Sequence, residues 1–149
     1  MNINIVNKSE NPLPKYARHG DAGMDICAAE DDMISPFNWT AVSTGLYVEI
    51  PEGYEIQIRS RSGLAFKHGI SVLNSPGTID SGYRGEIQVI LKNSDHHRYE
   101  IKKGDRIAQM VVSEFTKASL TEVAELSETE RGEDGLGSTG KWLIRKNIM

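Results

Sequence analysis

The stretch Leu46-Tyr47-Val48-Glu49-Ile50-Pro51-Glu52-Gly53-Tyr54-Glu55-Ile56-Gln57-Ile58-Arg59 decides the fold class of this chain. Apolar and polar residues alternate on both sides of the turn signal Pro51-Glu52-Gly53. A period of two indicates a half-buried β-strand, because successive side chains of a strand point to opposite faces. The stretch therefore predicts two short strands separated by a turn.

The same period recurs further along the chain, at residues 87–92 and 108–113. Turn signals separate these runs at residues 74–77, 81–82, 93–95 and 103–105. Many short strands with regular punctuation predict an all-β barrel or sandwich. One short helix is expected over residues 63–68, with Ser62 as a candidate cap and Gly69 as its end. Residues 119–130 fit either a helix or a polar linker.

Composition narrows the class of protein. The 149 residues suit one domain with a core, and 38% of them are hydrophobic. The net charge of −4 argues against nucleic acid as the main partner. The single cysteine, Cys27, excludes an internal disulfide framework and indicates a reducing compartment. The sequence favours a buried apolar role for Cys27 over a role as a catalytic thiol. No signal peptide or membrane span is expected, so a cytoplasmic protein is predicted.

A change of composition near residue 117 predicts three parts: a β-barrel domain over 1–116, a polar connector over 117–130 and a glycine-rich tail over 131–149. The segment Arg131-Gly132-Glu133-Asp134-Gly135-Leu136-Gly137-Ser138-Thr139-Gly140 opens that tail. Glycine-rich backbone can turn its N–H groups toward an anion, and hydroxyls and a guanidinium add donors. The tail is therefore either a polyphosphate cradle or a polar disordered terminus.

A second candidate lies in the turn-rich stretch 74–86. Asp80 could accept a proton from an attacking water, or it could make an Asx hydrogen bond in a turn. Tyr83 could contact a ligand beside Asp80, or it could be a half-buried aromatic residue of a strand. In the stretch 59–65, Ser62 stands where it could cap the helix or bind a phosphate at the helix start. The histidines lack the spacing of a metal site.

Five such segments, in order and spacing, resemble the motifs of the trimeric dUTP pyrophosphatases (dUTPases). They are residues 22–26, 61–65, 77–85, 104–109 and 131–140. The resemblance covers nearly the whole chain. It implies a distorted jelly-roll β-barrel with one short helix and a flexible C-terminal tail, a homotrimer with shared active sites, and hydrolysis of dUTP to dUMP and pyrophosphate with Mg²⁺ as cofactor.

The resemblance also implies a role for each matching residue. Asp80 would activate the water that attacks the α-phosphorus, and Asp25 would hold the metal through water. The uracil and deoxyribose would be bound by Asn74, Ile79, Tyr83 and Leu136. The phosphates would be bound by Arg61, Ser62, Gly63, Gln109, Arg131, Ser138 and Thr139.

Two residues of the tail depart from the family pattern. Leu136 stands where an aromatic residue usually stacks on uracil, and Asp134 replaces a usual glycine. Two rival functions stay open on the same fold: a dCTP deaminase, which would need a glutamate near the pyrimidine, and a non-catalytic nucleotide-binding protein, which would lack Asp80 or the tail.

Overall fold

The computed structural model describes residues 1–135, and in this range it contains eleven strands and one helix. In chain order these are β1 (Asn4–Asn7), β2 (Met24–Cys27), β3 (Asp32–Ile34), β4 (Trp39–Ser43), β5 (Leu46–Glu49), β6 (Tyr54–Arg59), α1 (Ser62–His68), β7 (Ile70–Val72), β8 (Gly77–Ile79), β9 (Gln88–Asn93), β10 (Tyr99–Ile101) and β11 (Arg106–Glu114).

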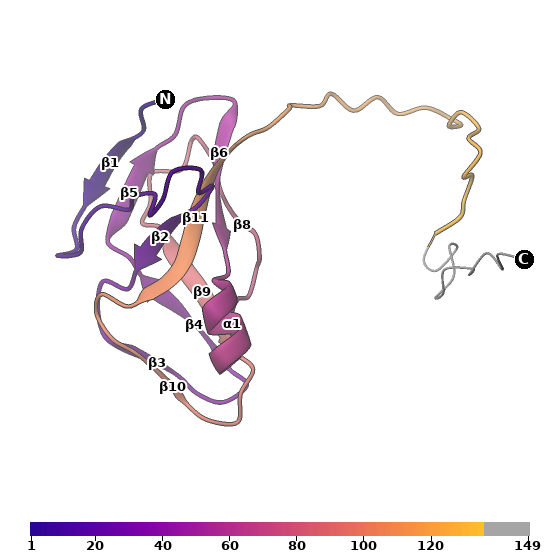
Figure 1. Cartoon of the computed structure of the whole chain (residues 1–149). Helices are drawn as coiled ribbons and strands as arrows, with labels where there is room; N and C mark the ends of the chain where they lie inside the picture. The colour runs from indigo at the N-terminus through magenta and orange to yellow at the C-terminus, as the bar shows by residue number, and fades with distance from the viewer. Residues whose placement is uncertain (136–149) are drawn as a thin grey trace, which may run out of the picture. The chain divides into compact units, whose positions relative to one another are not determined.

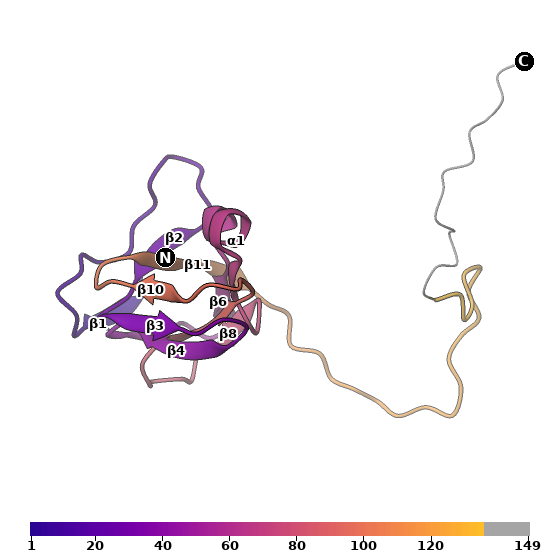
Figure 2. The same ribbon diagram turned by 90° about the horizontal axis from the view of Figure 1, so that it is seen from below.

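The strands form four antiparallel ladders (Figure 1). The larger two have the orders β2-β11-β6-β8 and β4-β9-β7, and the smaller two are β1-β5 and β3-β10. Figure 2 shows β3 and β10 side by side, with α1 on the outside of the strands. Neighbours in a ladder are distant in sequence, and the ladders do not join into one closed barrel. The predicted all-β, distorted jelly-roll fold is confirmed.

The alternation that predicted the strands also determines the core. Leu46, Val48, Ile56 and Ile58 are at most 3% exposed, whereas Glu49 between them is exposed. They join inward-facing residues of every large ladder in one apolar cluster. Burying each such side chain stabilises the fold by about 1.5–3 kcal/mol.

Helix α1 begins at Ser62, one residue earlier than predicted. Arg61 is the N-cap, without a side-chain hydrogen bond, and Ser62 is already the first helical residue. The expectation that Ser62 caps the helix is therefore wrong, because a cap must lie outside the first turn. Gly69 does end the helix, with a left-handed φ of 64°.

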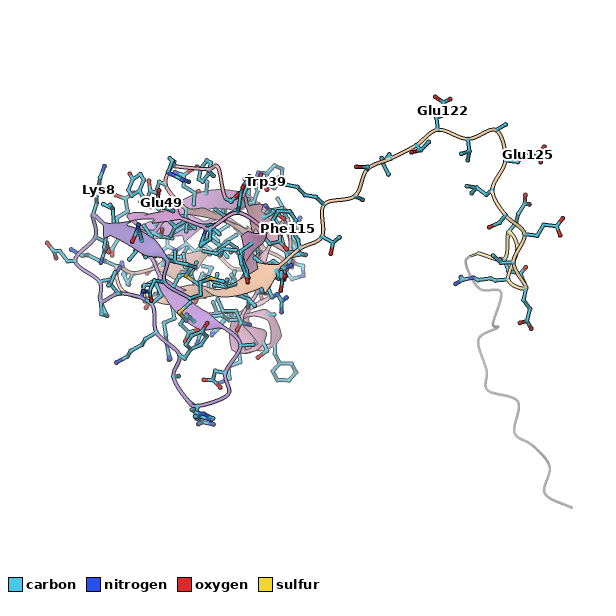
Figure 3. All side chains as sticks on the ribbon, turned by 90° about the horizontal axis from the view of Figure 1, so that it is seen from above. Lys8, Trp39, Glu49, Phe115, Glu122 and Glu125 are labelled. Atoms are coloured by element: carbon cyan, nitrogen blue, oxygen red, sulfur yellow. The ribbon has the colours of Figure 1, made fainter. Side chains whose placement is uncertain are left out.

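The chain divides into two units, Met1–Lys117 and a second unit that begins at Ala118. Residues 118–135 contain neither helix nor strand, so the helical alternative for 119–130 is wrong. The side chains of Leu120 and Leu126 are 96% and 89% exposed, which leaves no apolar face to stabilise a helix. Figure 3 shows Glu122 and Glu125 spaced along this connector. Leu136, Ser138 and Thr139 lie outside the described residues.

Helix α1 is 7 residues long. No helix in residues 1–135 has both the length and the apolar character that a membrane crossing requires.

Candidate active site

The first cluster of predicted site residues lies at one end of the ladder β2-β11-β6. Asp25 is opposite Gln109, and Gln109 is opposite Arg59, so the three residues share the outer face of the sheet. The Asp25 carboxylate pairs with Arg61 Nε at 2.8 Å and with Arg106 Nη1 at 3.3 Å. The predictions missed Arg106, which lies 81 residues from Asp25 and meets it only across the β2-β11 ladder.

Gln109 is fixed by contacts on both sides. Its Nε2 donates to the Ser60 carbonyl at 3.1 Å, and a Cβ atom at Gly23 would lie 2.5 Å from its Oε1. The Gln109 side chain thus fills the space beside Gly23, and a side chain at position 23 would displace the Gln109 amide. Asp25 and Gln109 line a cleft of about 320 Å³, together with Lys15, Ala17, Asp21, Ala22, Gly23, Arg59 and Val111.

The start of α1 lies beside this cluster. Arg61 Nη1 donates to the Arg106 carbonyl at 3.0 Å, which holds the guanidinium between β2 and β11. The first hydrogen bond within the helix runs from Ala65 N to the Arg61 carbonyl. The N–H groups of Ser62 and Gly63 precede it, so they have no partner within the helix and can donate to an anion.

Gly63 itself is not required by its surroundings in this chain. A Cβ atom built there has no heavy atom of residues 1–135 within 4 Å, and its φ lies outside the left-handed region. The predicted grouping of Asp25, Arg61, Ser62, Gly63 and Gln109 is thus brought together in space.

The second cluster lies on the loop between β8 and β9, two strands that belong to different sheets. Asp80 directly follows β8 and is exposed, and Tyr83 N donates to its carbonyl at 3.0 Å in a tight turn. The Tyr83 hydroxyl donates to the Glu86 carbonyl at 2.9 Å. Ile79, Asp80 and Tyr83 line a cleft of about 290 Å³, together with Ala41, Thr78, Glu86, Gln88 and Ile90.

Asn74 lies in the connection between β7 and β8. Its side chain lies against Gly77, where an added Cβ would come within 3.2 Å of Asn74 Nδ2. Asn74 is exposed and lines neither of the two clefts.

Glu86 anchors the end of the loop between β8 and β9, a role that the predictions missed. Its carboxylate accepts hydrogen bonds from the Ser43 hydroxyl, from Thr44 N at 3.1 Å and from Gly45 N at 2.8 Å. Burial raises the pKa of Glu86, but the hydrogen bonds from Ser43, Gly45 and Thr44 outweigh it and hold the pKa below its usual value. The carboxylate therefore stays ionised while it ties this loop to the β4–β5 turn.

The two clusters do not meet within one chain. Asp25 is level with Arg59 in the ladder, whereas Ile79 is level with Ile56, three residues further along β6. Strand spacings of ~4.8 Å and a rise of ~3.3 Å per residue place Asp25 and Ile79 ~17 Å apart. A third and larger hollow, of about 530 Å³, contains none of the predicted site residues; its lining is Asn2, Asn4, Glu49, Ile50, Pro51, Glu52, Ser81, Gly82 and Arg84.

The donor set for a metal is small. Within residues 1–135, no group of three or more His, Cys, Asp or Glu side chains is placed to hold an ion. Asp25, with a side chain 33% exposed, offers one carboxylate whose two oxygens each keep a free lone pair beside the arginine contacts. This fits Mg²⁺ bound mainly by phosphate oxygens and water, for which one carboxylate suffices.

Cys27 follows Asp25 by two residues and is half-buried. Burial raises the pKa of the Cys27 thiol, and the nearby Asp25 carboxylate raises it further. A raised pKa suppresses the thiolate form, so a structural role for Cys27 is supported over a catalytic one.

Of the four site residues predicted in the tail, only Arg131 is among the described residues. It lies in a turn in which Asp134 N donates to the Arg131 carbonyl at 3.1 Å and Arg131 Nε donates to the Asp134 carbonyl at 3.0 Å. Gly132 in this turn has a φ of 51° and donates to the Thr129 carbonyl. The unusual Asp134 therefore contacts Arg131 through its backbone.

A family model, individual relatives and solved structures all show similarity to this chain. The family model described as dUTPase matches residues 9–140. Deoxyuridine 5'-triphosphate nucleotidohydrolase of Zymomonas mobilis is 54% identical over 129 residues, which cover 87% of this chain and 88% of that protein. The enzyme of the same name from Wolinella succinogenes is 54% identical over 142 residues and 95% of each chain.

Solved structures agree. The dUTPase of Staphylococcus bacteriophage 80alpha, bound to dUpNHpp, superposes with a TM-score of 0.82 at 30% identity over 93% of this chain and 98% of its own. The dUTPase of the S. aureus phage phi11, described with a structural Mg(II) ion, gives a TM-score of 0.79 at 26% identity over 86% and 100% of the two chains. The chain belongs to the dUTPase family.

Proposed function

We propose that this protein hydrolyses dUTP to dUMP and pyrophosphate, with Asp80 as the general base. Asp80 is exposed at the mouth of a cleft and has a tyrosine, Tyr83, three residues away on the same turn. A carboxylate there can take a proton from a water whose oxygen attacks the α-phosphorus. The bond from the α-phosphorus to the bridging oxygen breaks, and pyrophosphate leaves with the bonding electrons. The placement of Asp80 in this cleft is the observation that carries the proposal.

The phosphates would be bound by the first cluster. Arg61 is held in place by Asp25 and by the Arg106 carbonyl, and Ser62 and Gly63 direct N–H groups outward from the helix start. Gln109 adds an amide whose position Gly23 and Ser60 fix. Fixed donors aimed at developing charge stabilise a phosphoryl transition state without a cost of reorganisation. Arg131, Ser138 and Thr139 of the tail would add donors at the far phosphate.

The base and sugar would be bound by residues around β8. Asn74 with neighbouring backbone would read the polar edge of uracil, and Ile79 would contact its face. Tyr83 would lie under the deoxyribose and leave no room for a 2′-hydroxyl, which rejects UTP by steric exclusion. Leu136 would close over the base through apolar contact in place of stacking.

Mg²⁺ is the proposed cofactor. When bound, it would neutralise charge on the triphosphate as a Lewis acid. Asp25 would hold its water ligands from the protein side, while the arginines at 2.8 and 3.3 Å keep the Asp25 carboxylate oriented.

A homotrimer with shared active sites would unite the two clusters. The ~17 Å between Asp25 and the Asp80 loop in one chain exceeds the few ångströms over which a base and phosphate ligands must act together. A neighbouring chain that places its β8–β9 loop over the Asp25 cluster would complete the site. The trimer and the cytoplasmic location are both proposals, and the trimer is tested by light scattering at micromolar concentration, where a monomer mass would contradict it.

The reaction is tested by product analysis. The protein is incubated with Mg²⁺ and separately with dUTP, dCTP, UTP and dTTP, and the products are separated. Formation of dUMP and pyrophosphate from dUTP alone is expected. Release of ammonia from dCTP would support the deaminase instead, and binding of dUTP without products would support a non-catalytic binder.

A further inference from the structure

The Tyr83 side chain lies back across the backbone of the two residues at the end of its loop. Its hydroxyl donates to the Glu86 carbonyl at 2.9 Å. A Cβ atom built on Gly85 would lie 2.5 Å from Tyr83 Cζ and 2.9 Å from Cε2. Non-bonded carbon atoms pack at ~3.5–4.0 Å. The tyrosine ring therefore occupies the space that any side chain at position 85 would need.

The backbone at Gly85 does not by itself require glycine. Its φ lies outside the left-handed region, in contrast to Gly45 and Gly69, so an L-residue could adopt it without strain. The three heavy atoms nearest to a Cβ built on Gly85 all belong to the Tyr83 side chain. Gly82, next to Tyr83, has no atom of residues 1–135 within 4 Å of a Cβ and no positive φ. The two glycines thus differ in the presence of the ring.

We propose that Gly85 is a positioning residue that sets the place of the Tyr83 ring in the substrate cleft. This inference rests on the proposed function, in which Tyr83 lies under the deoxyribose. With glycine at 85, the ring can lie directly on the loop backbone. A methyl group at 85 displaces the ring from that position in the cleft of about 290 Å³, which Ile79 and Asp80 also line. The ring then no longer lies where the sugar needs it.

Stability and substrate binding should respond differently to that methyl group. Tyr83 is 44% exposed, and the atoms that clash belong to the far end of its side chain. The ring can move toward solvent without disturbing the core, and the hydrogen bond it loses is exposed to water. The fold therefore tolerates Gly85→Ala, whereas a substrate that needs the ring in one place does not.

The experiment compares Gly85→Ala with the unsubstituted protein in steady-state hydrolysis of dUTP. Gly85→Ala is expected to raise KM about tenfold, the equivalent of ~1.4 kcal/mol. Its kcat should stay within about threefold, because the change acts on binding and not on the reacting atoms. Its unfolding temperature should match that of Gly82→Ala, which serves as the control for stability.

The same substitution is then made in a Tyr83→Ala background. If Gly85 acts through the ring, Gly85→Ala adds nothing to KM there, since the two changes remove one interaction. The role of Gly85 is overturned if Gly85→Ala leaves KM for dUTP unchanged. It is also overturned if Gly85→Ala raises KM, or prevents folding, in the protein that lacks the Tyr83 ring. Failure of the unsubstituted protein to hydrolyse dUTP would instead overturn the proposed function itself.

Discussion

Removal of the Glu86 carboxylate should destabilise the protein and change its response to acid. Glu86 accepts one hydroxyl and two backbone N–H donors from residues 43–45, and its side chain is half-buried. Hydrogen bonds to a charged group contribute ~1.5–3 kcal/mol when buried and less when water competes. For three donors on a half-buried group, Glu86→Ala should cost about 2–4 kcal/mol of unfolding free energy.

The dependence of the unfolding free energy on pH in the acid range gives a sharper test. The variant for this test is Glu86→Gln, which keeps a hydrogen-bond acceptor and removes the charge. The folded state holds the pKa of Glu86 below its unfolded value. Its stabilisation is therefore full above the unfolded pKa of about 4.3 and is lost as the pH falls through the lower folded pKa. The difference in unfolding free energy between the unsubstituted protein and Glu86→Gln should be largest near pH 7 and shrink below about pH 4.

Denaturant unfolding at several pH values and one protein concentration measures this difference. Glu49→Gln is the matched control, because Glu49 pairs with Arg84 at 3.6 Å on the surface and its side chain is 57% exposed. An exposed pair contributes ~0–1 kcal/mol. Equal pH profiles for the Glu86→Gln and Glu49→Gln proteins would refute the anchoring role of Glu86.

Four further outcomes test the proposed site. Asp80→Asn should lower kcat at least ~100-fold while dUTP binding by calorimetry stays within about tenfold, because an amide cannot accept the proton; near-normal turnover would remove Asp80 from the mechanism. Tyr83→Ala should raise kcat/KM for UTP relative to dUTP, and an unchanged ratio would place sugar discrimination elsewhere. Gly63→Ala should leave the unfolding temperature unchanged or higher, since nothing in residues 1–135 opposes the new methyl group, yet weaken dUTP binding; unaltered affinity would contradict phosphate binding there. Truncation after Glu130 should leave thermal stability intact and lower turnover strongly, and full activity would exclude a role for the tail.

Local patterns in the sequence predicted the helix α1 and four of the eleven strands, β5, β6, β9 and β11. Alternation predicted the strands at 46–50 and 54–59 and the face of each that is buried, and Gly69 marked the end of α1. These features depend on residues within a few positions of one another, so a single sequence reveals them. Ser62 shows the limit of such local patterns, because its exact place relative to the cap depends on Arg61, which contacts Asp25 and β11.

The motifs also identified the family and most residues of the two clusters. Asp25, Arg61 and Gln109 were predicted as one site and lie together, and Asp80 and Tyr83 share a cleft. The resemblance of five motifs in order carries this information, because each motif taken alone is also typical of an ordinary turn or helix start.

Only the tertiary structure showed which groups hold these residues in place. Arg106 reaches Asp25 across 81 positions of sequence, and Glu86 reaches Thr44 across 42. It also placed Asp25 and Ile79 ~17 Å apart, although the motif of the second cluster lies between two motifs of the first along the chain. Strand pairing between distant segments decides such contacts, and pairing depends on the whole core being formed at once. The sequence by itself thus determined what the site is made of, and the packed sheets decided where each part lies.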